Sequence, residues 1–92
     1  MPVTIHLSGY LKPFSGGATE VRLDESPATV ADALESIWKQ HPALRDRVLT
    51  ETGEIRQHVN IFVGSMDVKR LNGLQSPVTG GEMHIFNAVS GG

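Results

Sequence analysis

A repeat of apolar residues in the middle of the chain predicts a single amphipathic α-helix. Its spacing is i, i+3, i+4, i+7 and i+8, which places the five side chains on one helix face. The members of this repeat are Val30, Ala33, Leu34, Ile37 and Trp38. Thr29 is predicted to cap the helix through its hydroxyl group, with Asp32 at capping-box spacing, and Pro42 is predicted to end it. Such a helix needs a second layer, such as a sheet, to bury its apolar face.

Alternating apolar and polar residues before this helix predict two strands. Residues 3–8 and 20–23 alternate with a period of two, so each segment presents one apolar face. The segment 11–17 between them contains a proline and a glycine pair, and we expect it to be a hairpin loop. Because this connection is short, the two strands are predicted to be antiparallel.

Three more strands are predicted after the helix. Residues 59–63 alternate, and a glycine-serine turn leads from them into residues 67–70, which would complete a second hairpin. Residues 83–87 are predicted to form the last strand. Residues 43–49 are expected to add a short second helical turn.

The order of these elements is strand, strand, helix, strand, strand, strand, which indicates an α+β fold of the β-grasp type. We expect a mixed sheet of four to five strands with one main helix packed on one face. Right-handed connections would place the first and last strands side by side and parallel in the sheet centre. The domain is expected to span residues 1–87, followed by a flexible C-terminal tail over residues 88–92.

The composition limits both size and function. Ninety-two residues and 9.9 kDa provide for one small domain. The chain has 8 Lys and Arg residues, which are scattered along the sequence, and 10 Asp and Glu residues. Nucleic acid is therefore not an expected partner. The absence of cysteine excludes disulfides, Cys-ligated metals and thiol nucleophiles. No apolar run approaches the roughly 20 residues of a membrane span, so we expect a cytoplasmic protein without a membrane partner.

The C-terminal segment ends in two residues that lack a Cβ atom. Its residues are Ala88, Val89, Ser90, Gly91 and Gly92. Five extended residues span about 17 Å, which is enough to reach a buried site in another protein. Glycine suits this role because its backbone fits where a side chain would collide. Taken alone, however, a Gly-Gly end more often marks a frayed terminus.

Four motifs lie in order between residue 58 and the C-terminus. They are HVNIFV at 58–63, DVKRLNGL at 67–74, Pro77 with the turn TGGE at 79–82, and AVSGG at 88–92. Together they resemble the MoaD/ThiS family of ubiquitin-like sulfur carriers. The helix segment TVADAL at 29–34 is also similar to that family, so the resemblance covers nearly the whole chain. The motifs VNIFV and DVKRL are most similar to the CysO-type carriers.

This resemblance implies chemistry at the C-terminus. An activating enzyme of the ubiquitin-activating type would use ATP to adenylate the Gly92 carboxylate. A sulfur donor would then displace the adenylate and leave a thiocarboxylate, while residues 88–91 thread into the partner's active site. A downstream enzyme would accept the sulfur in the biosynthesis of cysteine or another sulfur-containing metabolite. The chain would bind no cofactor itself and would be a monomer when free.

Other functions that use the same tail stay open. The chain could be the small subunit of a molybdopterin synthase, or a ubiquitin-like modifier whose Gly92 forms isopeptide bonds with lysine. A plain interaction module with an incidental glycine end is a further alternative. The sequence contains no Gly-rich phosphate loop, nucleophile elbow or plausible carboxylate pair, so we expect a protein cosubstrate and not an enzyme.

Strand parity predicts a partner-binding patch. If the other apolar residues of the third strand face the helix, Phe62 points to the opposite side, and Phe86 points out beside it. We expect Phe62, Phe86 and Leu71 to dock the adenylating enzyme, because exposed aromatic groups often mark partner surfaces. A loop or the second short helix could instead cover the phenylalanines. Lys69 and Arg70 could pair with acidic partner residues, although exposed charges are often merely solvated.

Two of the four histidines are predicted to be neighbours. His6 and His84 lie on the first and last strands, which are expected to pair. Two imidazoles suggest a metal or a proton-transfer site. With no carboxylate at helical spacing, and with His41 and His58 elsewhere in the chain, we expect no metal site.

Overall fold

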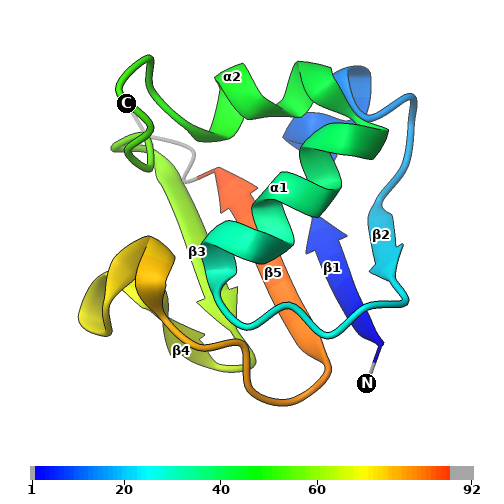
Figure 1. Ribbon diagram of the computed structural model, residues 1–92. Coiled ribbons are helices and arrows are strands. Elements are labelled where there is room, and N and C mark those ends of the chain that lie inside the picture. The colour runs from blue at the N-terminus through cyan, green and yellow to red at the C-terminus, as the bar shows by residue number, and fades with distance from the viewer. Residues whose placement is uncertain (1, 88–92) are drawn as a thin grey trace.

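The computed structural model describes residues 2–87, whose five strands form one sheet in the order β2-β1-β5-β3-β4 (Figure 1). The strands are β1 (Val3–Leu7), β2 (Glu20–Leu23), β3 (Val59–Val63), β4 (Met66–Asp67) and β5 (Glu82–Asn87). β1 and β5 are parallel neighbours in the centre, while the other three pairings are antiparallel. This topology confirms the predicted β-grasp, and the predicted first strand is only one residue too long.

The connection between β1 and β2 differs from the predicted hairpin loop. Gly9–Phe14 forms a 3-10 helix, η1, which buries the Leu11 side chain in the core. Gly16 and Gly17 then adopt φ angles of 65° and 89°, a conformation that favours glycine and turns the chain toward β2. The predicted loop is wrong at this point because a proline and a glycine pair indicate a break in regular structure, but a short 3-10 helix can contain the proline, as η1 contains Pro13.

The predicted amphipathic helix is α1 (Val30–Gln40), which crosses one face of the sheet (Figure 1). The backbone N–H of Asp32 donates to Thr29 Oγ1 at 3.2 Å, so Thr29 is the N-cap as predicted. All five residues of the apolar repeat are buried. After the C-cap His41, Pro42 starts a different helix, in agreement with its predicted role as the end of α1.

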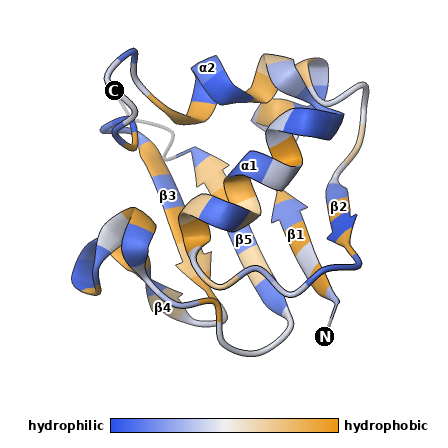
Figure 2. Cartoon of the chain, viewed as in Figure 1, coloured by the Kyte–Doolittle hydropathy of each residue, from blue (hydrophilic) through white to orange (hydrophobic). Residues whose placement is uncertain are grey.

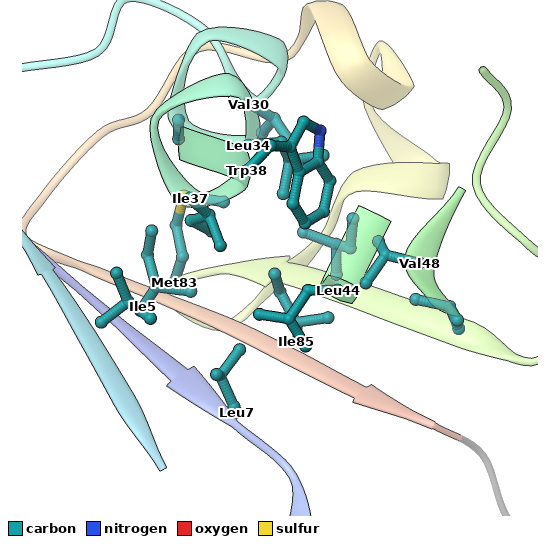
Figure 3. Close-up of a cluster of buried hydrophobic side chains, with 14 of the residues drawn as sticks. Ile5, Leu7, Val30, Leu34, Ile37, Trp38, Leu44, Val48, Met83 and Ile85 are labelled. Carbon is teal, nitrogen blue, oxygen red and sulfur yellow. The ribbon is translucent and has the colours of Figure 1, made fainter. Parts of the chain in front are cut away.

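The predicted second helical turn consists of two short helices on the same side of the sheet as α1. They are η2 (Pro42–Leu44) and α2 (Arg45–Val48). Leu44 and Val48 are fully buried and lie above Ile85 of β5 in the core (Figure 3). These helices therefore extend the layer formed by α1 and do not cover the opposite side of the sheet.

The second hairpin is shorter than predicted. β4 ends at Asp67, and the next three residues form the 3-10 helix η3 (Val68–Arg70) in place of a strand. Asp67 Oδ1 accepts a hydrogen bond from the Lys69 N–H at 2.9 Å, which caps this helix. Val68 is fully buried, so the turn of helix brings an apolar side chain into the core. A further 3-10 helix, η4 (Gly73–Gln75), follows.

One face of the sheet is buried beneath the helices, and the other face is at least partly exposed. Strand residues that point toward the helical layer are buried in the core cluster, and Figure 3 labels Ile5, Leu7, Met83 and Ile85 among them. Apolar and polar residues alternate along β1 (Figure 2), and buried and partly exposed residues alternate along both β1 and β3. None of the helices within residues 2–87 is long and apolar enough to span a membrane.

Candidate partner-binding face

The candidate site is the sheet face that points away from α1, which we call the open face. Its residues alternate with the core residues, and all of them are at least partly exposed. The open face comprises Thr4, His6, Glu20, Arg22, Asn60, Phe62, Asp67, Glu82, His84 and Phe86. It thus combines two aromatic rings and two imidazoles with charged groups nearby.

One row of side chains runs across all five strands of this face. The cross-strand pairs are Glu20 with His6, His6 with His84, His84 with Phe62, and Phe62 with Asp67. Direct cross-strand partners lie close enough for their side chains to interact. The row therefore places the imidazole pair directly beside Phe62 of the aromatic pair, with a carboxylate at each end.

Phe62 and Phe86 form the apolar part of the open face. Their ring centroids lie 5.4 Å apart and the ring planes are tilted by 34°. Phe86 is 37% exposed and Phe62 is half-buried, which agrees with the outward orientation predicted from strand parity. The alternative that the second short helix covers them is wrong, because Leu44 and Val48 pack that helix into the core on the α1 side.

The other three predicted docking residues come from η3 and its C-cap, beyond the edge strand β4. Lys69, Arg70 and Leu71 are exposed, with Leu71 at 42%. Lys69 Nζ donates to the backbone carbonyl of Gln57 at 3.5 Å. They follow β4 along the chain, so the predicted patch divides into an aromatic pair on the sheet and a separate exposed segment beyond the edge strand.

His6 and His84 are neighbours, as predicted. Their rings stack with centroids 4.7 Å apart and an angle of 15° between the planes. His6 Nε2 lies 3.3 Å from Glu82 Oε1, and His6 Nδ1 lies 3.8 Å from Glu20 Oε1. The search for carboxylates at helical spacing missed both acids, whereas the period of two along β5 would have placed Glu82 on the same face as His84.

The predicted tail, Ala88, Val89, Ser90, Gly91 and Gly92, lies outside the described residues. β5 ends at Asn87, which pairs with Val59 at the start of β3. Phe86 is the residue immediately before Asn87, so the tail begins next to the aromatic pair.

Comparison with known proteins agrees with this architecture. The ThiS family profile matches residues 5–92. Small archaeal modifier protein 1 of Haloferax volcanii is 36% identical over 77 residues, which cover 83% of this chain and 85% of that protein. Small archaeal modifier protein 3 of the same organism is 33% identical over 72 residues, which cover 77% and 76% of the respective chains.

Two solved structures extend the likeness to three dimensions. The crystal structure of SAMP1 from Haloferax volcanii has a TM-score of 0.82 and 32% identity, with full coverage of both chains. CysO in the BexX/CysO complex of Amycolatopsis orientalis has a TM-score of 0.86 and 27% identity, with 98% of this chain and 99% of that chain covered. The sequence motifs, the β-grasp topology and the near-complete profile match agree, and the chain belongs to the ThiS family of ubiquitin-like proteins, the MoaD/ThiS group.

Proposed function

We propose that this protein is a sulfur carrier whose Gly92 carboxylate is converted to a thiocarboxylate. The observation that carries the proposal is that the ThiS family match extends through the Gly-Gly end to residue 92. The compact fold holds the start of this tail at the end of a central strand. The protein would thus be a cosubstrate of other enzymes and would not turn over a substrate alone.

The reaction requires two steps on the partner enzyme. A carboxylate oxygen of Gly92 attacks the α-phosphorus of ATP, pyrophosphate leaves, and an acyl adenylate forms. Hydrosulfide then attacks the acyl carbon and AMP leaves with the bonding electron pair, which gives the thiocarboxylate. The chain contains no cysteine whose thiolate could attack the adenylate first. The thiocarboxylate sulfur would next serve as a nucleophile in the formation of cysteine or another sulfur-containing metabolite.

The open face supplies a docking surface for the activating enzyme. Phe62 and Phe86 present an aromatic pair directly beside the start of the tail, so burial of this pair would position the tail at the partner's active site. Lys69 and Arg70 would meet acidic residues at the edge of the same interface. A CysO protein similar to this chain has been crystallised in a complex with BexX, which supports a function exerted through a protein partner.

A protein modifier is the second candidate. Two relatives, at 36% and 33% identity, are named small archaeal modifier proteins. A modifier would use the same adenylate, but a lysine amine would attack the acyl carbon and AMP would again leave, which forms an isopeptide bond. The two functions share the activation step and differ in the nucleophile that receives the acyl group.

The shared step is tested with a chain that lacks Gly91 and Gly92. An activating enzyme of the ubiquitin-activating type should release pyrophosphate with the full chain and not with the shortened one. Equal release with both chains would contradict activation at Gly92 and would favour a plain interaction module. Detection of peptides in which a lysine side chain is joined to Gly92 by an isopeptide bond would favour the protein modifier over the sulfur carrier.

A further inference from the structure

We infer that His6, Glu82 and His84 form a binding site for a divalent transition-metal ion, Zn²⁺ in particular. Each residue offers one ligand atom, and these atoms all lie within 4.8 Å of one another. Two imidazole nitrogens and one carboxylate oxygen are a donor set that zinc takes in proteins. The site lies on the open face and is separate from the C-terminal chemistry proposed above.

The separations permit a shared ion once the side chains rotate. The stacked rings of His6 and His84 are only 15° from parallel, so at least one ring must turn before both nitrogens point at the same ion. With metal–ligand bonds of about 2.0–2.2 Å, neighbouring ligand atoms around a tetrahedral zinc ion lie about 3.4 Å apart. His6 Nε2 and Glu82 Oε1 are already 3.3 Å apart. The other separations, up to 4.8 Å, must shorten. Glu82 is an exposed side chain and His84 is half-buried, so rotation about their side-chain bonds can bring the atoms together.

The backbone beneath these side chains is rigid. His6 is the direct cross-strand partner of His84 in the central β1–β5 pair, and Glu82 precedes His84 by two residues on the same strand. On the opposite face of these strands, Ile5 and Met83 are fully buried in the core. Because the backbone is fixed, only the side chains have to move when an ion binds, which limits the entropic cost of binding.

A fourth residue can orient one of the ligands. Glu20 is the cross-strand partner of His6 on the other side, and its Oε1 lies 3.8 Å from His6 Nδ1. A carboxylate that accepts the Nδ1 proton of a histidine leaves the Nε2 lone pair free for a metal ion. Glu20 would therefore be a positioning residue and not a ligand.

The donor set also predicts selectivity. Imidazole favours zinc, nickel and copper, whereas magnesium and calcium prefer oxygen ligands. Three protein ligands leave at least one coordination position of a tetrahedral ion to water. A bound ion would link β1 to β5. The link would lie beside Phe62, which is the other cross-strand partner of His84.

Calorimetric titration of the full chain, without a histidine tag, tests this inference. Zn²⁺ should bind with 1:1 stoichiometry and micromolar affinity, and Mg²⁺ should give no saturable heat. Glu82→Gln and His84→Ala should each weaken zinc binding at least about 10-fold, and Glu20→Gln about 10-fold. The control is His58→Ala, which removes an exposed imidazole outside the cluster and should leave binding unchanged.

Thermal unfolding provides a second readout that does not depend on activity. Zinc should raise the melting temperature of the wild-type chain and of His58→Ala, but not that of Glu82→Gln, because an ion that binds only the folded state stabilises it. Glutamine has nearly the same size as glutamate, and the Glu82 side chain is exposed, so the Glu82→Gln variant should fold normally. The site is ruled out if the wild-type chain shows no saturable zinc binding. It is also ruled out if wild type, Glu82→Gln and His84→Ala bind zinc equally well. His6 would then be a partner of two carboxylates only.

Discussion

Phe86, the penultimate residue of β5, packs against Phe62 of β3, with 5.4 Å between the ring centroids. The two rings are diagonal neighbours, because Phe62 pairs directly with His84 and Phe86 with Asn60. The sheet thereby places an exposed aromatic surface at the point where the C-terminal residues begin. This arrangement links partner binding to delivery of the tail.

Phe86→Asp should abolish adenylation of Gly92 without unfolding the protein. Phe86 is partly exposed near the end of the central strand β5, so the substitution should not disturb the core. In the complex, the new carboxylate would be buried in the partner interface without a compensating charge or hydrogen bond. We expect the affinity for the activating enzyme to fall by at least about 30-fold, as for an interface hot spot. Pyrophosphate release and a far-UV circular dichroism spectrum measure the two effects.

Tyr10→Asp is the matched control for this substitution. Tyr10 is an aromatic residue of η1 that is 58% exposed and is not part of the aromatic pair, so the same substitution there should leave adenylation intact. Normal adenylation of a folded Phe86→Asp chain would refute the docking role of the open face.

Charge reversal at Lys69 and Arg70 should slow association with the activating enzyme. Both side chains are exposed on η3, and exposed charges act mainly on encounter rates. The double substitution to glutamate should lower the association rate about 10-fold at low salt and much less at high salt. Surface plasmon resonance gives both rates, and Lys39→Glu on α1 is the control. The control changes the net charge by half as much as the double substitution, so an effect from the control about half as large would show that net charge, and not this segment, sets the rate.

Thr29→Ala should lower the free energy of unfolding by about 1 kcal/mol. Thr29 Oγ1 accepts from the Asp32 N–H at the start of α1, and alanine leaves this donor without its cap. Thr29→Ser retains the hydroxyl group and should preserve most of the stability. Urea denaturation distinguishes the two variants, and equal loss in both would mean that the methyl group matters more than the cap.

Gly64→Ala should destabilise the fold through the backbone alone. Gly64 adopts a φ of 59° in the β3–β4 turn, while an added Cβ would meet no atom within 4 Å. The left-handed conformation should cost alanine about 1 kcal/mol in unfolding free energy. Gly9→Ala also adds a methyl group to open space but without a positive φ, so thermal unfolding should show a smaller effect. Equal melting temperatures of the two variants would contradict a cost from the left-handed conformation at Gly64.

The sequence was sufficient to predict the topology because its periodicities are long and unambiguous. The apolar repeat of α1 and the alternation in β1 and β3 each determine which side chains face the core. Short segments were harder to predict. Residues 67–70 contain too few positions to distinguish a strand from a 3-10 helix, and the capping contact of Asp67 decides the outcome.

The candidate site was only partly predictable for a related reason. Strand parity was enough to orient Phe62 and Phe86, because it depends on a single strand at a time. The cluster of His6 with Glu20 and Glu82 depends on the registers of two strand pairs, β1–β2 and β1–β5. A sequence pattern does not fix such registers directly, so the two carboxylates were not associated with the histidine pair.

The most direct test of the sulfur-carrier proposal is the intact mass of the protein after incubation with ATP, an activating enzyme and sulfide. The proposal predicts a gain of about 16 Da, for replacement of one oxygen by sulfur, located at Gly92 by fragmentation. A chain incubated without ATP should keep its original mass. An unchanged mass, with an enzyme shown to be active on another carrier, would contradict the formation of a thiocarboxylate.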